Sequence, residues 1–428
     1  MAEIVVKKSE RLCGEVYAPP SKAYTHRMMI AALLSEGVSR ILNPLYSDDT
    51  RATLQAAEAF GAEVGLDENC WTIKGKPQLE TPRNPIDCGE SGATLRFMIP
   101  VAALAPGPST FTLGSSLSRR PLEPLLQSLK QLGAKSNLQQ LEKGSVVKVH
   151  GGGIRGRKTS IRGDISSQFI SGLLFACPRA EENTEIAVAT PLESRSYVQM
   201  TIEVLEKHDI RVFASNDLRQ LGIPSNQIYS SCDHKVLGDF SSASFLLTAA
   251  AITCSKVKVK NLDHRTIQGD KAILGILGET GSKIQIADEY IEVEGSQLSA
   301  IDLDTKDIPD LVPVCAALAC YSKGTSRLYN ARRLMYKESD RLSSLYTELK
   351  KMGADIKIFE DGLIIRGPSP LHGATIDPHN DHRIAMACAV AALGASGETR
   401  IQHSECVRKS YPNFFDDLRA LGAVIVGG

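Results

Sequence analysis

The sequence has no surplus of charge, because 49 Lys and Arg residues balance 49 Asp and Glu residues over 428 positions. Proteins that bind DNA or RNA usually carry a basic surplus, so a nucleic-acid partner is disfavoured. A locally basic site for a small anion is still compatible with this balance. The apolar (43%) and charged (23%) fractions are those of an ordinary globular protein.

Membrane and secretion signals are also missing. No apolar run reaches the roughly 20 residues of a membrane span, and the first residues show no signal core or transit character. The ten cysteines include no Cys-x-x-Cys pair, which favours reduced thiols over a disulfide framework. We therefore expect a cytoplasmic protein with no membrane partner.

Several catalytic signatures are absent too. There is no Walker A sequence, no Gly-x-Ser-x-Gly, no His-Glu-x-x-His and no nucleotide fingerprint. His379 and His382 lie near Asp377 and Asp381, but their irregular spacing does not suit a zinc site. We expect no metal.

One pattern does recur along the whole chain. A helical run ends in Gly-Ala or a near equivalent and is followed by an extended apolar segment, in steps of 69 to 76 residues. The residue at the end of each helical run is Gly61, Gly133, Asp209, Gly281, Gly353 or Gly422. The pattern predicts six α/β units. A chain of 428 residues is longer than one hydrophobic core usually supports, and the repeats of solenoid proteins are usually shorter than these units. We therefore favour two globular domains with a boundary near Lys235.

Basic residues stand at or near the predicted helix starts. They are Lys22, Arg27, Arg96, Arg120, Arg341, Arg383 and Lys409. The N–H groups at a helix start bind phosphate or carboxylate, so converging starts would favour a polyanionic substrate. Asp310 and Glu338 could supply acid–base chemistry among these cations. The alternative, that each cation is simply solvated, stays open at this point.

The turn "DCGESGATLRFM" from Asp87 has glycines on both sides of Glu90-Ser91. Such a turn can bring backbone amides close to an anion, and it can equally be structural.

Eight motifs resemble the 5-enolpyruvylshikimate-3-phosphate synthase family in order and spacing. They are "PSKAYTHR", "GESGATLRFM", "RRPLEPLL", "GDISSQFISGLL", "IPDLVPV", "KESDRL", "NDHRIAMA" and "VRKSYPNFFDDL". The resemblance covers the chain from about Leu12 to Leu418. It implies a two-domain, inside-out α/β fold of six βαβαββ units, three in each domain. One domain would hold residues 19–234 and the other residues 1–18 with 235–428, with the active site in the cleft between them.

The resemblance also implies a reaction. The enolpyruvyl group of phosphoenolpyruvate passes to the 5-hydroxyl of shikimate 3-phosphate by addition–elimination and phosphate is released, as a step of the shikimate pathway to chorismate and the aromatic amino acids. No cofactor is implied, the expected partners are the two small substrates, and we expect a monomer. The family is the target of glyphosate.

By motif, the resemblance assigns roles to residues. The shikimate 3-phosphate set is Lys22, Arg27, Ser166, Ser167, Gln168, Ser194, Tyr197, Asp310 and Lys337. The phosphoenolpyruvate set is Lys22, Gly92, Arg120, Gln168, Arg341, Arg383 and Lys409. Asp310 would accept the proton of the 5-hydroxyl, Glu338 would protonate carbon, and Lys22 would contact both substrates.

The sequence departs from the family pattern at three positions. Ala23 replaces a serine, Arg333 replaces an Asn or Asp, and Glu90 places a negative charge beside an anion site. Two alternative functions share parts of this pattern. A UDP-N-acetylglucosamine enolpyruvyl transferase would have a reactive Cys where this chain has Ser115, and a non-catalytic repeat scaffold would not need the set Lys22, Asp310 and Glu338.

Overall fold

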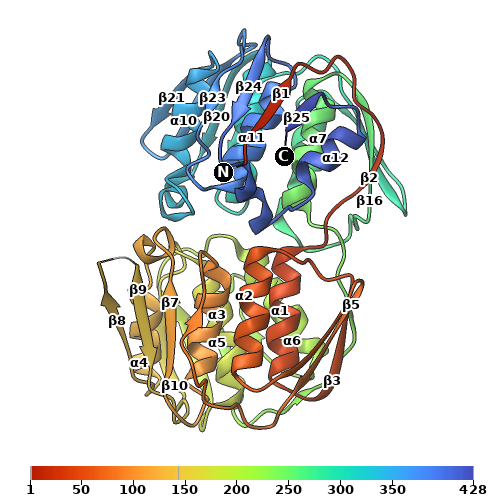
Figure 1. Ribbon diagram of the computed structural model, residues 1–428. Coiled ribbons are helices and arrows are strands. Elements are labelled where there is room, and N and C mark those ends of the chain that lie inside the picture. Colours follow the sequence, from red (N-terminus) through yellow and green to blue (C-terminus); the bar gives the residue numbers. More distant parts are fainter. Residues whose placement is uncertain (1, 143, 428) are drawn as a thin grey trace. The chain divides into compact units, whose positions relative to one another are not determined.

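The computed structural model describes residues 2–142 and 144–427 and divides into two compact units (Figure 1). Unit 1 is Met1–Pro20 with Leu237–Gly428, and unit 2 is Ser21–Val236. Each unit has its own core of buried apolar side chains.

Three sheets in each unit share one strand order. Numbered along each repeat, the strands lie in the order first, second, fourth, third; the first two are parallel and the other pairs antiparallel. In unit 2 the first sheet contains β14 (Tyr229–Ser230) and β15 (His234–Lys235) beside β3 (Ser35–Leu42), followed by β5 (Cys70–Gly75) and β4 (Glu63–Asp67). The second sheet contains β6 (Ile86–Asp87), β7 (Ser109–Leu113), β9 (Ser145–Val149) and β8 (Ser136–Gln140). The third contains β10 (Arg157–Ile161), β11 (Thr184–Val188), β13 (Gln220–Ile223) and β12 (Phe213–Ala214).

Unit 1 repeats this arrangement, and the N-terminal strand completes its last sheet. The strands are β2 (Cys13–Tyr17), β16 (Lys256–Lys260), β18 (Tyr290–Glu294) and β17 (Lys283–Ile286); β19 (Asp302–Asp304), β20 (Gly324–Tyr329), β22 (Gly362–Gly367) and β21 (Asp355–Phe359); and β23 (Thr375–Ile376), β24 (Glu398–Ile401), β1 (Ile4–Lys7) and β25 (Ile425–Gly427). Because β1 pairs with β24 and β25, both ends of the chain lie in one sheet. The predicted α/β class and its six βαβαββ units, three per domain, are confirmed.

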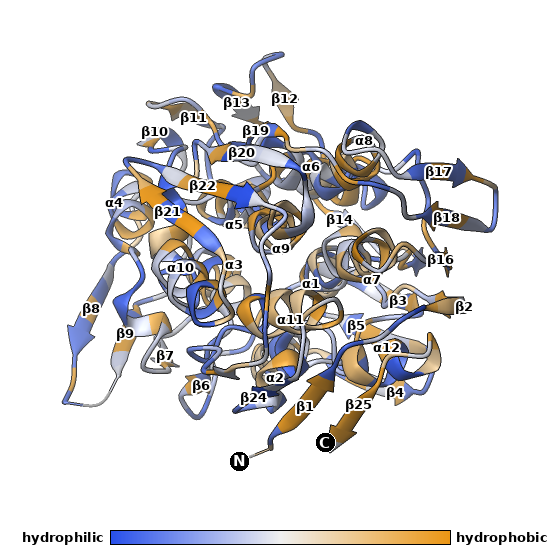
Figure 2. Ribbon diagram, turned by 90° about the horizontal axis from the view of Figure 1, so that it is seen from above, coloured by the Kyte–Doolittle hydropathy of each residue, from blue (hydrophilic) through white to orange (hydrophobic). Residues whose placement is uncertain are grey.

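The first helix of each repeat is buried almost all round. These helices are α1 (Lys22–Leu33), α3 (Gly92–Ala102) and α5 (Ser167–Ala176) in unit 2, and α7 (Phe240–Ile252), α9 (Val312–Tyr321) and α11 (His382–Ala392) in unit 1. Every residue of α7 and of α11 is buried. Figure 2 shows α7, α9 and α11 in apolar colours, with the strands of unit 1 around them. A helix that is apolar on all sides is stable only inside a core, so the sheets form the outside of each unit.

The second helix of each repeat buries one face and ends as the sequence predicts. These helices are α2 (Asp48–Ala59), α4 (Glu123–Gln131), α6 (Arg195–Lys207), α8 (Ile273–Glu279), α10 (Arg341–Lys351) and α12 (Phe414–Ala420). Two residues after each lies a residue with positive φ, namely Gly61, Gly133, Asp209, Gly281, Gly353 or Gly422, with φ from 62° to 115°. A left-handed residue ends a helix and turns the chain into the next strand, and glycine adopts it without a Cβ clash. The sequence repeat is therefore a repeat of helix C-termini.

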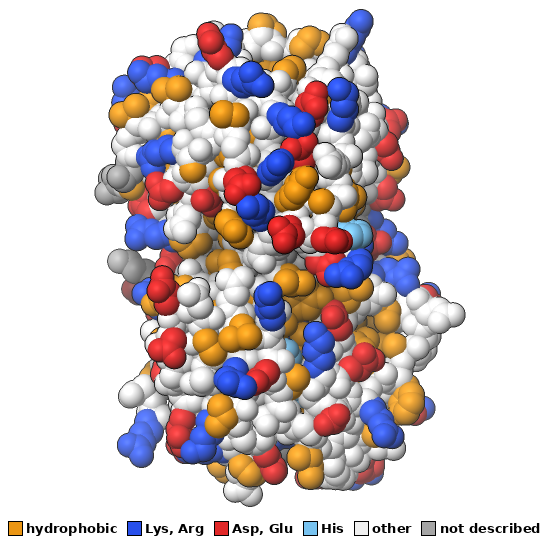
Figure 3. Space-filling model, turned by 90° about the vertical axis from the view of Figure 1, so that its right-hand side faces the viewer, with side chains coloured by type: hydrophobic (Ala, Val, Ile, Leu, Met, Phe, Trp, Pro, Cys, Tyr) orange, Lys and Arg blue, Asp and Glu red, His pale blue; other side chains and the backbone are white. Residues whose placement is uncertain are grey.

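On the face drawn in Figure 3, basic and acidic side chains are interspersed, as the zero net charge leads one to expect. None of the helices in the described part of the chain is long and apolar enough to cross a membrane.

Three buried histidines, His26, His208 and His234, make the stability of unit 2 depend on pH, and burial lowers the pKa of each. Burial lowers the pKa of His26 and of His234 from 6.5 to about 3, so folding favours their neutral forms. Below pH 6.5 the unfolded chain then binds more protons than the folded chain. The free energy of unfolding therefore decreases, as the pH is lowered, by about 1.4 kcal/mol per pH unit for each of these two histidines.

We expect His234→Asn to flatten the loss of unfolding free energy between pH 6.5 and 5 by about 2 kcal/mol. The single tryptophan, Trp71, is buried in β5, so its fluorescence during urea unfolding reports on unit 2. The exposed His150 provides the control His150→Asn. An unchanged slope in His234→Asn would show that His234 does not contribute to this dependence.

Candidate active site

Asp310 lies among three cations of unit 1. Its Oδ1 is 2.8 Å from Nη1 of Arg341 and 3.4 Å from Nζ of Lys337, and its Oδ2 is 3.5 Å from Nη2 of Arg383. Burial alone would raise the pKa of Asp310, but Arg383, Lys337 and Arg341 together hold it well below its ordinary value. Burial lowers the pKa of Lys337 to about 8. Asp310 is therefore an ionised acceptor in a cationic setting.

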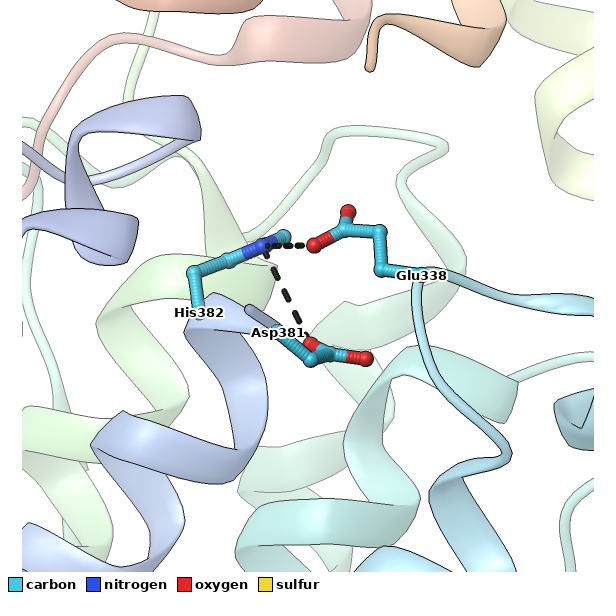
Figure 4. Close-up of side chains that lie close together, drawn as sticks. All are labelled: Glu338, Asp381 and His382. Carbon is cyan, nitrogen blue, oxygen red and sulfur yellow. Dashed lines mark hydrogen bonds and ion pairs between the residues drawn. The ribbon is translucent and has the colours of Figure 1, made fainter. Parts of the chain in front are cut away.

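Glu338 contacts His382 on the next buried helix (Figure 4). Nδ1 of His382 donates to Oε2 of Glu338 at 2.7 Å, while Arg341 and Lys409 lie 3.8 and 4.0 Å from the carboxylate. Burial would raise the pKa of Glu338, but His382, Lys409 and Arg341 lower it well below the usual value. A proton can thus be shared between Glu338 and His382.

Asp381 and Arg341 fix this group. Asp381 caps α11 by accepting from the backbone N–H of Arg383 at 3.0 Å, and its carboxylate accepts from Nε of Arg341 at 2.8 Å. Arg341 is 2% exposed and is the first residue of α10. Its charge therefore joins Asp310, Glu338 and Asp381 in one network, and the pKa of Arg341 is raised above its usual value despite burial.

Glu338, Asp381 and His382 could together offer three ligand atoms to a metal ion, within 4.8 Å of one another. The ion pairs already described account for this grouping, since Arg341 neutralises Asp381 and His382 donates to Glu338.

The ammonium group of Lys409 is bound by the loop before α11. Its Nζ donates to the carbonyl of Asn380 at 2.5 Å. Asn380 and its neighbour His379 both have positive φ, and Nε2 of His379 lies 3.0 Å from the buried carboxylate of Glu348. This loop is therefore tied to α10 and to the 3₁₀ turn η6 (Ser404–Lys409).

Lys22, the first residue of α1, forms an ion pair in unit 2. Its Nζ is 2.9 Å from Oδ2 of Asp49 in the first turn of α2. The helix is capped by Ser21, whose hydroxyl accepts from the N–H of Tyr24 at 3.5 Å. The carboxylate of Asp49 thus holds the Lys22 ammonium at the end of a buried helix.

Arg27 is buried and bound on three sides. It donates to the hydroxyl of Thr201 at 2.8 Å and to the carbonyls of Ala23 and Tyr197 at 2.8 and 2.9 Å. Its guanidinium lies 5.7 Å from the centroid of the Tyr197 ring. Burial lowers the pKa of Arg27 to about 10, so it remains charged at neutral pH.

Arg96 and Arg120 surround Gly92 at the start of α3. A Cβ on Gly92 would lie 3.3 Å from Nη1 of Arg120 and 3.5 Å from Nη1 of Arg96. Arg96 donates to Oε1 of Gln168 at 2.8 Å and to the hydroxyl of Ser166 at 3.5 Å. Burial and the charge of Arg120 lower the pKa of Arg96 to about 9. The guanidinium groups of Arg96 and Arg120 thus both lie next to Gly92, which has no side chain.

Three serines begin helices α5 and α6. Ser166 caps α5 by accepting from the N–H of Gln168 at 3.3 Å, and Ser167 is its first residue. Ser194 precedes α6 in a left-handed conformation, with φ of 54°.

The structure brings the predicted residues together in groups within each unit. The expectation of cations at helix starts is correct for Lys22, Arg341 and Arg383, whereas Arg120 and Lys409 lie in or beside 3₁₀ turns. The residues that the resemblance assigned to the two substrates did not include Asp49, Arg96, Asp381 and His382, which contact them, although Arg96 was expected as a cation near a helix start. Asp381 and His382 stand inside the "NDHR" motif, which could have indicated them.

The six repeats and the clustered cations define a class of two-unit α/β proteins, and comparison identifies the family. A profile of the family EPSP synthase (3-phosphoshikimate 1-carboxyvinyltransferase) matches residues 6–418. The chain is 43% identical over 426 residues to the 3-phosphoshikimate 1-carboxyvinyltransferase of Methanocaldococcus jannaschii, and 40% identical over 434 residues to that of Clostridium novyi. These matches cover 99% of this chain and 99% and 98% of the relatives.

A solved structure of EPSP synthase from Acinetobacter baumannii is also similar, with a TM-score of 0.83, 26% identity and full coverage of both chains. The chain belongs to the EPSP synthase family.

Proposed function

We infer that the chain is a 3-phosphoshikimate 1-carboxyvinyltransferase. It transfers the enolpyruvyl group of phosphoenolpyruvate to the 5-hydroxyl of shikimate 3-phosphate and releases phosphate, a step of the shikimate pathway. The observation that carries this conclusion is the family match along 413 of its residues, from 6 to 418. The substrates are small anions, which suits the cationic groups of both units.

We assign the grip on phosphoenolpyruvate to cations of both units. Arg341, Arg383 and Lys409 would bind it from unit 1, and Lys22 and Arg120 from unit 2, beside Gly92 and Gln168. Among the described residues, Nε of Arg120 has no hydrogen-bond partner, which supports its use by an anionic ligand. Arginine forms paired hydrogen bonds with phosphate and carboxylate groups, so this set favours a substrate that carries both.

The remaining predicted residues would bind shikimate 3-phosphate. They are Lys22, Arg27, Ser166, Ser167, Gln168, Ser194, Tyr197, Asp310 and Lys337. The capped start of α5 offers hydroxyl and N–H donors to a phosphate. Arg27 already makes three hydrogen bonds within unit 2, so we propose that it supports the ring site through Tyr197 as well as by charge.

Asp310 and Glu338 would move the protons. Asp310 accepts the 5-hydroxyl proton as the oxygen attacks carbon 2, and Glu338 delivers a proton to the methylene carbon. In the structure, neighbouring cations hold both carboxyls ionised. When the anionic substrates bind those cations, the hold on Glu338 weakens and its pKa rises, which lets it carry the proton shared with His382.

The reaction is tested by incubating the protein with phosphoenolpyruvate and shikimate 3-phosphate and measuring phosphate. We expect release only when both substrates are present. Replacement of shikimate 3-phosphate by UDP-N-acetylglucosamine should give none, and release with that substrate instead would favour the alternative transferase. Folded protein that releases no phosphate with either acceptor would overturn the proposed function.

We expect Gly92→Ala to raise the KM for phosphoenolpyruvate about tenfold. The added methyl would lie 3.3 Å from Nη1 of Arg120, so the guanidinium must move away from its ligand position. The KM for shikimate 3-phosphate should stay unchanged in steady-state assays. Gly278→Ala is the control, because a Cβ there meets nothing within 4 Å. An unchanged KM for phosphoenolpyruvate would remove Gly92 from that site.

A cytoplasmic location, a monomeric state and the absence of a nucleic-acid partner remain our proposals. So does the placing of the active site between one domain of residues 19–234 and another of residues 1–18 with 235–428.

A further inference from the structure

Glu90 is the one acidic residue that the sequence placed beside an anion site without a reason. It lies half-buried in the turn between β6 and α3, two residues before Gly92. Its carboxylate accepts two backbone hydrogen bonds from a different loop. Oε1 accepts from the N–H of Ser116 at 3.1 Å, and Oε2 accepts from the N–H of Leu117 at 2.7 Å.

These two N–H groups begin the 3₁₀ turn η1 (Leu117–Arg119), which leads directly into Arg120. The first N–H groups of such a turn have no partner inside it, and a carboxylate is the strongest cap for them. The hydroxyl of Ser116 in turn accepts from Nη2 of Arg120 at 3.2 Å. Contacts therefore run from Glu90 through the backbone and side chain of Ser116 to the guanidinium of Arg120.

The two segments are docked along their length. The N–H of Gly114 donates to the carbonyl of Gly89 at 2.7 Å. A Cβ on Gly114 would lie 2.5 Å from Oε1 of Glu90 and 2.8 Å from the carbonyl oxygen of Gly89, so a side chain there would displace the carboxylate and the backbone of the turn. Gly92, at the other end of the turn, faces Nη1 of Arg120. One short turn, residues 89–92, thus contacts both the loop that carries Arg120 and its guanidinium.

We propose that Glu90 is a positioning residue for Arg120 in phosphoenolpyruvate binding. Its negative charge is directed at the two N–H groups of η1, and this explains why an acid is tolerated beside an anion site. The inference rests on the proposed function, specifically on the assignment of Arg120 to phosphoenolpyruvate.

Glu90→Ala removes both acceptors and should raise the KM for phosphoenolpyruvate about tenfold. The KM for shikimate 3-phosphate should change less than about twofold, because its proposed residues on α5 do not depend on η1. Glu90→Gln keeps the size and one acceptor oxygen, so its KM for phosphoenolpyruvate should lie between those of Glu90→Ala and the native chain. If Glu90→Ala does not fold, as judged by Trp71 fluorescence, Glu90→Gln alone decides.

Two further variants separate the possible failures. Gln227→Ala is the matched control, since this half-buried side chain accepts from the backbone N–H of Arg211 at 2.8 Å in the same unit. It should leave the KM for phosphoenolpyruvate unchanged. Arg120→Ala tests the underlying assignment, and an unchanged KM there would refute the role of Arg120 itself. A raised KM in Arg120→Ala with an unchanged KM in the Glu90 variants, or an equal rise for both substrates, would overturn the positioning role.

Discussion

Glu338→Gln should lower the turnover number about a thousandfold while shikimate 3-phosphate still binds. The amide keeps the size of the carboxyl group, and its oxygen can still accept from Nδ1 of His382, 2.7 Å from the native oxygen. It cannot carry a proton to the methylene carbon of phosphoenolpyruvate. The loss should therefore appear in kcat, because Glu338 transfers its proton only in the transition state and this transfer does not contribute to substrate binding.

The measurement is single-turnover phosphate release, paired with calorimetric titration of shikimate 3-phosphate. Glu398→Gln is the control, because Glu398 is an exposed carboxylate of the same unit that pairs with Lys7. If Glu338→Gln retains native turnover, Glu338 is not the proton donor. If binding of shikimate 3-phosphate is lost together with turnover, Glu338 has a structural role in the site.

Arg341→Met should lower the unfolding free energy of unit 1 by about 3 to 5 kcal/mol at neutral pH. Arg341 is buried and pairs with Asp310 and Asp381 at 2.8 Å each. Without it, Asp381 (0% exposed) keeps a buried charge that has lost its main cation. The cost of an uncompensated buried charge exceeds that of losing a surface ion pair several times over.

The pH dependence of this loss has a definite sign. In the native chain the pKa of Asp310 and of Asp381 is lowered, so their contribution is present above the ordinary value of 3.8 and is lost as the pH falls through the folded values. In Arg341→Met the carboxyl of Asp381 favours protonation, because it has lost its main cation, while Lys337 and Arg383 still face Asp310. The difference between variant and native chain should therefore shrink as the pH falls toward 4.

Hydrogen exchange of the α10 and α11 amides between pH 4 and 7.5 measures this difference in unit 1. Arg400→Met is the control, because Arg400 is half-exposed and pairs with the surface residues Glu3 and Glu398. It should cost no more than about 1 kcal/mol. A loss in Arg341→Met as small as the loss in Arg400→Met would contradict the buried network.

The fold was predictable where local chemistry repeats. The helix ends at Gly61, Gly133 and their four counterparts can be recognised from sequence because a left-handed residue after a helix selects glycine wherever it occurs. The cap at Asp381 is likewise local, since its carboxylate accepts an N–H two residues ahead. The family motifs implied the βαβαββ composition of the units, which spacing alone does not determine, and the order of the strands in each sheet came from the structure.

The partners of the site residues could not be read in the same way. Glu90 caps a turn 27 residues away, and Asp49 pairs with a lysine at the same separation. Both contacts depend on which elements pack together, so neither can be predicted from the residues next to them in the sequence. Arg96 was recognised as a cation near a helix start, but its contact with Gln168 joins α3 to α5 and appears only when the buried helices are packed.

Deuterium incorporation tests the central claim, that the chain transfers the enolpyruvyl group by addition and elimination with Glu338 as the proton donor. In deuterium oxide, addition places a deuteron on the methylene carbon, and elimination then removes one of the three hydrogens from the methyl group so formed. Mass spectrometry of the product should therefore show deuterium in the enolpyruvyl methylene with the native chain, and slowed incorporation with Glu338→Gln. Product formed at the native rate without deuterium on that carbon would contradict the account.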